Sequence, residues 1–402
     1  MSPTPFLLLL PVLALALVRP ARAEEPSEAP PTLGAAVASL EGASTFASLV
    51  RGTPLAEALG GAGPLTVLVP TDEAFAALPS AAREALAAPA GRDALLRVLA
   101  HHVVVGLVAD GALDGATSLA GERLALAGAT ARTAQAAANG VLVLVDRVIV
   151  PPTTGVRGDD GVAAAIAAAI ERGAPLYNEG NHAACALAYA ATAAGLAADD
   201  PSPLRVLHRA SLARALATGE DAGARAWALR RAFDALLLDL EFVPRSEAPL
   251  PAGFPGPGPV GAVVVKEYPR YRAARAEGGG SFWTLFRHIK RNEVAMTAPV
   301  EMTMDGDLGT VDMAFLYQAP DQGKAGTDGQ VEVLDLAPLT VLSVAIRGSS
   351  ARARLEEGKA ALEARARAEG WTAAGPYRLL GYNSPMVPAE RRLFELQLPV
   401  TR

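Results

Sequence analysis

The feature that most constrains how this chain folds is a proline- and glycine-rich stretch, VPRSEAPLPAGFPGPGPVG, at residues 243–261. Proline has no backbone N–H and a fixed φ, so a segment this rich in proline cannot run through a packed helix or a central strand. A second break, VPPTTGVRGDDG, lies at 150–161. The 402 residues are enough for two or three domains. We therefore expect structured blocks at about 32–152, 161–242 and 258–402, with a linker at 243–257.

The N-terminal segment, residues 1–23, has the pattern of a secretory signal peptide. An apolar core from Phe6 to Val18 is followed by Ala-Arg-Ala at 21–23, which predicts cleavage before Glu24. An uncleaved anchor is the alternative, although these 13 apolar residues are short for a membrane span of about 20. The pattern favours a secreted or periplasmic protein that is not an integral membrane protein after cleavage.

Charge and cysteine content exclude several classes of function. The net charge of −6 over the whole chain argues against a nucleic-acid partner. The single cysteine, Cys185, excludes an intramolecular disulfide, a Cys-x-x-Cys site and covalent attachment of c-type haem. His182 precedes Cys185 by three residues and could share its helix face, but two ligands do not make a metal site. We predict no metal centre.

The first block alternates short strands and helices. The β-branched run 65–69 predicts a buried strand that Pro70 ends, and Thr71-Asp72 then offers an N-cap to a helix. Asn139-Gly140 predicts a hairpin turn. Asp146 lies in the apolar run after that turn, where its expected role is that of a buried hydrogen-bond acceptor.

Three stretches of this block resemble the fasciclin family. They are TVLVPTDEAFAALP, NGVLVLVDRVIVPP and the pair His101-His102, in which His101 stands where the family has tyrosine. Adjacent histidines point in different directions, so they are poorly placed to chelate one metal. The resemblance implies an extracellular adhesion or scaffold role without catalysis, with a matrix component or a protein as partner.

The middle block is predicted to be almost wholly helical. Val162, Ile166 and Ile170 recur at helical spacing, and Gly173 and Pro175 are expected to end that helix. A second apolar stripe runs from Leu229 to Leu240. We interpret this block as a helical spacer or a protein-docking surface.

The third block contains one strongly amphipathic helix, expected at 281–291 with Ser281 as its N-cap. The helix puts a buried stripe on one face, formed by Phe282, Leu285, Phe286 and Ile289. Arg287 and Arg291 fall on the opposite face, whereas His288 and Lys290 fall on the two flanks. His288 is thus expected at the boundary between core and solvent.

Later strands in this block alternate. Leu342, Val344 and Ile346 share one face, and the apolar residues of 394–400 alternate with Glu395 and Gln397. A second helix is expected at about 350–369. Strand–helix–strands followed by the same order again predicts two similar halves that close an antiparallel sheet or barrel.

Residues 258–402 resemble the SOUL, or haem-binding protein, family. VKEYPRYRAA, FWTLFRHIKRNEVAMTAPV and GYNSPMVPAERRLFEL are the stretches that carry the resemblance. It implies a distorted antiparallel β-barrel with two flanking helices, and tetrapyrrole binding. The whole chain is therefore expected to be an α+β multidomain protein, with a fasciclin-like mixed α/β domain, a helical middle segment and a SOUL-like barrel.

A haem site needs an apolar slot for the ring, cations for the propionates and, in some proteins, an axial ligand on iron. The helix and the segment after it supply such groups: His288, Arg287, Lys290, Arg291, Phe282, Phe286 and Met296. His288 and Met296 are the candidate axial ligands. Binding through an apolar surface and cations, without a strong axial ligand, is favoured over either. Met296 and Pro299 are also consistent with ordinary strand packing.

These patterns favour an exported, non-enzymatic protein that binds haem or another planar, hydrophobic anion without a covalent bond. A pure interaction scaffold without a ligand is the first alternative. The second is a small-molecule hydrolase in the barrel pocket, for which Glu293 and His288 are the sole acid–base pair near the helix.

Overall fold

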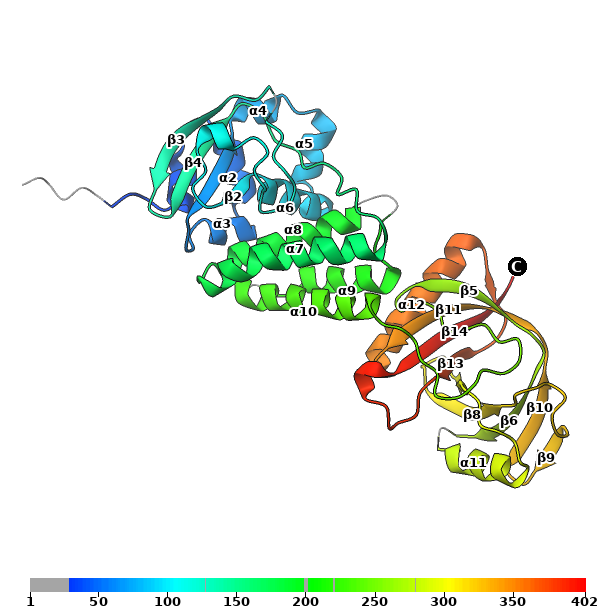
Figure 1. The fold of residues 1–402 in the computed structure, drawn as a ribbon. Helices are drawn as coiled ribbons and strands as arrows, with labels where there is room; N and C mark the ends of the chain where they lie inside the picture. The colour runs from blue at the N-terminus through cyan, green and yellow to red at the C-terminus, as the bar shows by residue number, and fades with distance from the viewer. Residues whose placement is uncertain (1–28, 127, 199–201, 220, 279) are drawn as a thin grey trace, which may run out of the picture.

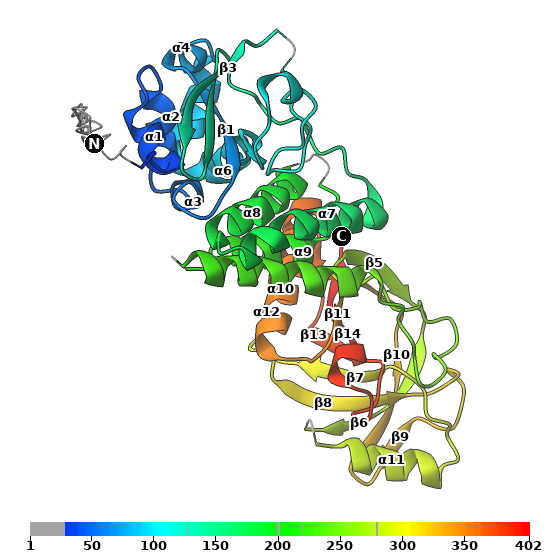
Figure 2. The same ribbon diagram turned by 60° about the vertical axis from the view of Figure 1, so that its left-hand side comes forward.

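The computed structural model describes residues 29–126, 128–198, 202–219, 221–278 and 280–402. The predicted signal peptide, residues 1–23, lies outside the described residues. An N-terminal α/β unit, a layer of helices and a C-terminal sheet domain follow one another along the molecule (Figures 1 and 2). The α+β multidomain class predicted from the sequence is confirmed.

The N-terminal unit is built on a four-stranded sheet in the order β2-β1-β4-β3. β1 pairs in parallel with β4, and the other neighbours are antiparallel. The strands are β1 (Leu65–Pro70), β2 (Val103–Val105), β3 (Ala131–Ala137) and β4 (Gly140–Val145), so the expected hairpin at Asn139-Gly140 is confirmed. The helices of this unit are α1 (Leu33–Ser39), α2 (Ser44–Val50), α3 (Pro54–Ala58), α4 (Asp72–Ala76), α5 (Ser80–Ala87) and α6 (Arg92–His101).

The expected cap at Thr71-Asp72 serves two helices. The Thr71 hydroxyl accepts a hydrogen bond from the Ala74 N–H at the start of α4. The Asp72 carboxylate instead accepts from the Thr45 and Ser44 N–H groups at the start of α2, and the hydrogen bonds from Thr45 lower the pKa of Asp72 to about 2. The expectation of a buried Asp146 is wrong, because this side chain is exposed where it accepts from the Thr130 N–H.

The two adjacent histidines are buried and point to separate partners. His101 Nδ1 lies 2.9 Å from the Ser118 hydroxyl. His102 Nδ1 donates to the Val98 carbonyl, which fixes the tautomer in which Nε2 accepts from the Ile149 N–H. Burial lowers the pKa of each histidine from 6.5 to about 4. Both imidazoles are therefore neutral core residues at neutral pH.

The helices of the middle block pack into the N-terminal unit. α8 (His182–Ala198) is buried along most of its length and contacts α3 and α6 as well as α7 (Gly158–Asn178) and α10 (Ala222–Leu240). The Asn181 amide, just before α8, donates to the carbonyls of Ala58 and Ala62. Because α8 is rich in small alanine side chains, the neighbouring helices can pack closely against it on every side. The middle block thus shares one hydrophobic core with the N-terminal unit.

Two local expectations for the middle block are corrected. Pro175 lies inside α7, which continues to Asn178 instead of ending at Gly173 or Pro175. His182 is exposed and stacks on Tyr177, whereas Cys185 is buried, so the two side chains do not form a common ligand pair. The remaining helix of the block, α9 (Val206–Leu216), lies between α8 and α10 in the sequence.

The C-terminal domain is a ten-stranded antiparallel sheet in the order β5-β11-β14-β13-β7-β8-β6-β10-β9, with β12 paired to β14. α11 (Phe282–Arg291) packs on β6, β8 and β10, and α12 (Arg352–Glu369) packs on β11 and β14, as Figure 1 shows. The two flanking helices are thus confirmed. Among the described residues, strand pairing does not join β5 to β9, so the expected barrel is not closed by hydrogen bonds. The strands are β5 (Val263–Tyr268), β6 (Tyr271–Glu277), β7 (Val300–Met304), β8 (Thr310–Leu316), β9 (Gly326–Asp328), β10 (Val331–Leu336), β11 (Leu339–Arg347), β12 (Thr372–Ala373), β13 (Tyr377–Gly381) and β14 (Leu393–Thr401).

Charged groups join the helical layer to the C-terminal domain. Asp239 near the end of α10 pairs with Arg347 at 2.6 Å, and the Arg205 guanidinium donates to the Val260 carbonyl at 2.7 Å. Asp239 and Arg347 are largely shielded from solvent, so this contact is less screened than a surface ion pair.

The buried histidines predict a dependence of stability on pH. Their folded-state pKa is depressed, so their contribution is fully present above pH 6.5, the unfolded value, and is lost as the pH falls toward about 4. The free energy of unfolding should fall by about 1.4 kcal/mol per pH unit for each histidine in this window. Urea unfolding of the N-terminal unit between about pH 7 and about pH 5 measures the slope.

The matched variant for this prediction is His101→Gln, which keeps a hydrogen-bonding group beside Ser118 and removes the titration. It should reduce the slope by roughly one proton's contribution. An unchanged slope in His101→Gln would contradict the assignment.

Candidate ligand-binding site

Helix α11 presents one face to the sheet and one to solvent. Leu285 and Ile289 are buried against the strands. Ser281 precedes the helix but does not cap it, because its hydroxyl donates to the Glu277 carbonyl. The basic residues of the last turn lie near the negative end of the helix dipole, where cations are favoured.

Three aromatic side chains of α11 form what we call the aromatic patch: Phe282, Trp283 and Phe286. Their ring centroids are 5.4 to 6.0 Å apart. Phe282 and Phe286 are half-buried, whereas Trp283 is 68% exposed. A large exposed aromatic surface beside a packed core is typical of a binding site.

Two of the predicted cations border the aromatic patch. Lys290 is exposed and its Nζ lies 5.5 Å from the centroid of the Phe286 ring. Arg287 is exposed, and its Nε donates to the Trp283 carbonyl at 3.2 Å. Arg291, also exposed, is held away from the patch by its ion pair with Asp328. The structure therefore places Arg287 and Lys290 with the aromatic rings, and Arg291 with β9.

His288 is a buried residue, so its expected position at the boundary is wrong. Its Nδ1 lies 2.7 Å from an Asp328 carboxylate oxygen, and its Nε2 lies 3.0 Å from the Tyr317 hydroxyl. The hydrogen bond from Arg291 and, to a smaller extent, the hydrogen bond from His288 lower the pKa of Asp328. Both ring nitrogens of His288 thus have protein partners, and a metal could reach this imidazole only by displacing one of them.

The remaining predicted residues near α11 lie apart from His288. Met296 is half-buried and packs in the cluster beneath the aromatic patch. Glu293 lies beyond the end of the helix with a φ of +53°, and its side chain is exposed. None of the hydrogen bonds between described residues joins Glu293 to His288, so the acid–base pair of the hydrolase alternative is not formed there.

The inner face of the sheet, opposite the helices, carries a buried polar network that the sequence analysis missed. The alternation expected in 394–400 puts Glu395 and Gln397 on the face opposite the apolar residues, and both are fully buried there. Lys266 pairs with Glu395 at 2.5 Å, and the Tyr382 hydroxyl donates to the same carboxylate at 2.9 Å. The alternation of polar and apolar residues in this strand predicts that Glu395 and Gln397 share one face of the sheet. Alternation alone does not say whether that face is exposed or enclosed.

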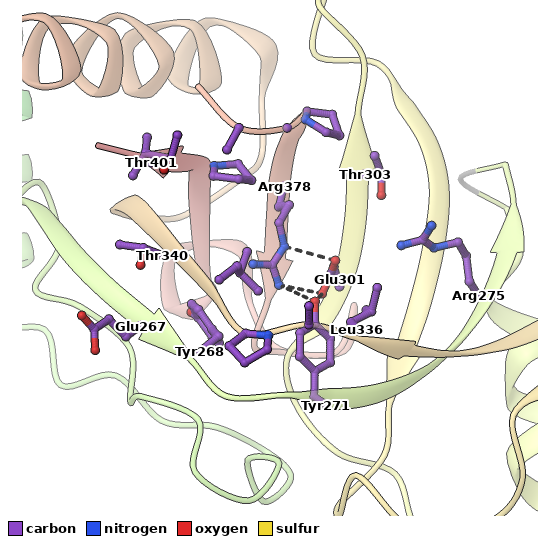
Figure 3. Close-up of a pocket in the computed structure, with 18 residues that line it drawn as sticks. Glu267, Tyr268, Tyr271, Arg275, Glu301, Thr303, Leu336, Thr340, Arg378 and Thr401 are labelled. Carbon is purple, nitrogen blue, oxygen red and sulfur yellow. Dashed lines mark hydrogen bonds and ion pairs between the residues drawn. The ribbon is translucent and has the colours of Figure 1, made fainter. Parts of the chain in front are cut away.

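Arg378 and Glu301 form a second buried ion pair on the inner face, which Figure 3 shows. The Arg378 guanidinium donates to both oxygens of Glu301, at 3.1 and 2.7 Å, and the Tyr271 hydroxyl donates to Glu301 at 3.1 Å. Burial alone would raise the pKa of Glu301, but the charge and hydrogen bonds of Arg378 hold it below its usual value. Arg378 also lies 5.2 Å from the Tyr268 ring and 5.9 Å from the Tyr271 ring.

The proline-rich segment that was expected as a linker covers part of this inner face. Phe254 packs edge-on against Tyr268 and Tyr271 at centroid distances of 4.9 and 5.1 Å. The Gly258 N–H donates to Glu395, and Lys266 donates to the Gly256 carbonyl. The uncovered part of the face borders a cavity of about 720 Å³ that Tyr271, Glu301 and Arg378 help to line.

Comparison with known proteins matches residues 41–151 to the fasciclin domain family and residues 260–398 to the SOUL heme-binding protein family. A curated relative, protein sll1483 of Synechocystis sp., is 39% identical over 121 residues, which are 27% of this chain and 67% of that protein. The chain therefore combines a fasciclin domain with a SOUL domain.

The solved structures that match this chain have low sequence identity and low TM-scores. The EcmrR C-terminal domain is 16% identical with a TM-score of 0.29, over 35% of this chain and 97% of that one. A protein described as a hydrolase from Listeria innocua is 14% identical with a TM-score of 0.28, over 35% of this chain and 91% of that one. Scores this low support no functional argument.

Domains of these two families are generally non-enzymatic binding domains, and their presence supports a binding or scaffold protein. Fasciclin domains are commonly extracellular or on the cell surface. Within the part of the chain that the structure describes, no helix has the length and apolar character needed to cross a membrane. The same residues contain no cluster of three potential metal ligands.

The ion pair between Arg378 and Glu301 predicts a large effect of single substitutions. Arg378→Met should lower the free energy of unfolding by about 3–5 kcal/mol, because it leaves a buried carboxylate without its partner. The double variant Arg378→Met/Glu301→Leu should lose much less. Urea unfolding of the unaltered protein, Arg378→Met, Glu301→Leu and the double variant measures the difference.

A surface pair supplies the control. Arg365→Met removes the exposed ion pair with Glu369 on α12 and should cost at most about 1 kcal/mol. If the double variant lost the sum of the two single losses, the buried pair would not be a coupled unit.

Proposed function

We propose that this protein is an exported, non-enzymatic binding protein whose SOUL domain holds a planar, hydrophobic anion at the aromatic patch of α11. Haem or another tetrapyrrole is the class of ligand that fits. The fasciclin domain would contact a matrix component or a protein partner. The observation that carries the proposal is the exposed Trp283 flanked by Phe282 and Phe286, with Arg287 and Lys290 at the border.

The chemistry of the patch matches the chemistry of such a ligand. Binding is favourable when a flat apolar ring covers exposed aromatic surface, because both surfaces are removed from water. Its carboxylates need donors at the edge of that surface, and Arg287 and Lys290 both reach solvent there. A small neutral aromatic ligand would leave these two cations unused, so their position favours an anion.

The hydrogen bonds of His288 support binding without a strong axial ligand. The imidazole is held between Asp328 and Tyr317, and these contacts tie α11 to the sheet. Coordination of iron by this histidine would break one of them inside the core. Met296 packs beneath the patch as an ordinary core side chain does. We therefore assign His288 a structural role and place the ligand on the outer face of the helix.

A haem titration followed in the Soret band tests the proposal. Trp283→Ala and the double variant Arg287→Gln/Lys290→Gln should each weaken binding by about tenfold, since each removes an aromatic contact or the propionate partners. His288→Gln should leave the position of the Soret band unchanged. The matched control is Arg365→Gln/Arg367→Gln on α12, which removes the same charge from a distant helix.

The outcomes of the titration distinguish binding without an axial ligand from axial ligation by His288 and from a scaffold without a ligand. A Soret shift lost only in His288→Gln would indicate axial ligation and would contradict the structural role. The absence of any saturable shift in the unaltered chain would exclude the tetrapyrrole and favour a scaffold without a ligand.

Export gives a second prediction, which concerns residues outside the described structure. The Ala-Arg-Ala motif at 21–23 predicts that the exported chain begins at Glu24. Mass spectrometry of protein recovered from the culture medium or the periplasm measures the N-terminus. Recovery of a chain that retains Met1 in the membrane fraction would instead support the uncleaved anchor.

A further inference from the structure

The cavity on the inner face of the sheet is separate from the aromatic patch. Ala274 and Ala276 of β6 pack under α11, together with Leu285. Side chains alternate between the two faces of a strand, so Arg275 projects to the opposite face, where it lines the cavity. A ligand in the cavity would therefore lie across the sheet from a ligand on α11.

The two arginines that line the cavity, Arg378 and Arg275, differ in the hydrogen bonds that their guanidinium groups make. Arg378 donates to Glu301 and to the Tyr271 hydroxyl, so its charge is compensated within the sheet. Arg275 Nε forms an ion pair with Asp312 at 3.7 Å, which is beyond hydrogen-bond distance, so this buried Nε has no hydrogen-bond partner. Among the hydrogen bonds of the described residues, none comes from the Arg275 guanidinium, which Figure 3 shows directed toward Thr303 and Glu301.

The rest of the lining combines a hydroxyl group with apolar surface. The Thr303 side chain makes no hydrogen bond to another described residue and lies on the same face as Glu301, two positions along β7. Leu336, Leu339 and several prolines supply an apolar wall. The volume of about 720 Å³ falls within the range of about 300–1,000 Å³ that is typical of small-molecule sites.

We infer that this cavity is a second ligand site, which takes a small organic carboxylate. The carboxylate accepts hydrogen bonds from the Arg275 guanidinium and the Thr303 hydroxyl, and the apolar body of the ligand packs against Leu336 and Leu339. The neutral pair of Arg378 and Glu301 forms a fixed polar wall. This inference does not depend on haem binding at α11.

The test uses a pair of probes that differ in charge alone. Naphthalene-2-carboxylate and the uncharged naphthalene-2-carboxamide are titrated into the full mature chain by isothermal titration calorimetry. The carboxylate should bind saturably, and Arg275→Gln should weaken it by about tenfold, because a charge-assisted hydrogen bond is lost. The affinity for the carboxamide should be nearly the same in both proteins.

Three variants guard against indirect effects. Arg270→Gln removes an exposed arginine from the turn between β5 and β6 and should leave both probes unaffected. Thr340→Trp fills the cavity from β11 and should abolish binding of both probes while circular dichroism shows an intact fold. Arg287→Gln/Lys290→Gln should change neither titration, which separates this site from the α11 patch.

The inference is overturned by either of two results. One is the absence of saturable carboxylate binding to the unaltered chain. The other is carboxylate binding that Arg275→Gln leaves unchanged or that only Arg287→Gln/Lys290→Gln removes. Failure of the haem titration alone leaves the cavity inference standing, since the two experiments use different probes and Arg275→Gln belongs to the cavity experiment.

Discussion

The buried ion pair between Arg378 and Glu301 is the interaction on which the C-terminal domain depends. A buried charge without its partner costs several kcal/mol, so β13 and β7 must keep the register that pairs Leu380 with Glu301. A shift by one residue would move Arg378 to the opposite face of the sheet. The pair between Lys266 and Glu395 adds the same constraint on β5 and β14. The inner face of the sheet is consequently fixed around these two ion pairs, and its apolar surface is confined to the cavity wall that includes Leu336 and Leu339.

In the proposed function, a flat hydrophobic ligand lies on the outer face of α11. His288, which looked like a candidate for iron from the sequence, joins this helix to Tyr317 and to Asp328 of β9. Arg291 strengthens the same junction. The residues left for a ligand are those that the junction does not use: Trp283 with its aromatic neighbours, Arg287 and Lys290. The basic residues and the histidine of one short segment therefore separate into a group that joins α11 to the sheet and a group that is exposed to solvent.

Much of the fold could be predicted from the sequence, because periodicity and turn chemistry are local signals. The amphipathic α11, the Asn139-Gly140 hairpin and the flanking α12 follow from such signals. The burial of Glu395 and Gln397 does not, since alternation marks two faces without saying which one the chain encloses. The proline-rich segment was expected to be a linker, yet Phe254 packs on the sheet, a contact that depends on residues distant in sequence. The buried position of His288 was missed because its partners lie on other elements.

The most direct test of the account is the response of the tryptophan indole N–H signals to haemin, measured by NMR. The chain has three tryptophans, which lie in separate places: Trp227 on α10, Trp283 on α11 and Trp371 just after α12. The account predicts that haemin, whose iron is paramagnetic, broadens the Trp283 signal selectively. Zinc protoporphyrin should shift the same signal without broadening it. Selective broadening of Trp371, whose neighbours Gly375 and Pro376 also line the inner cavity, would contradict the assignment to α11.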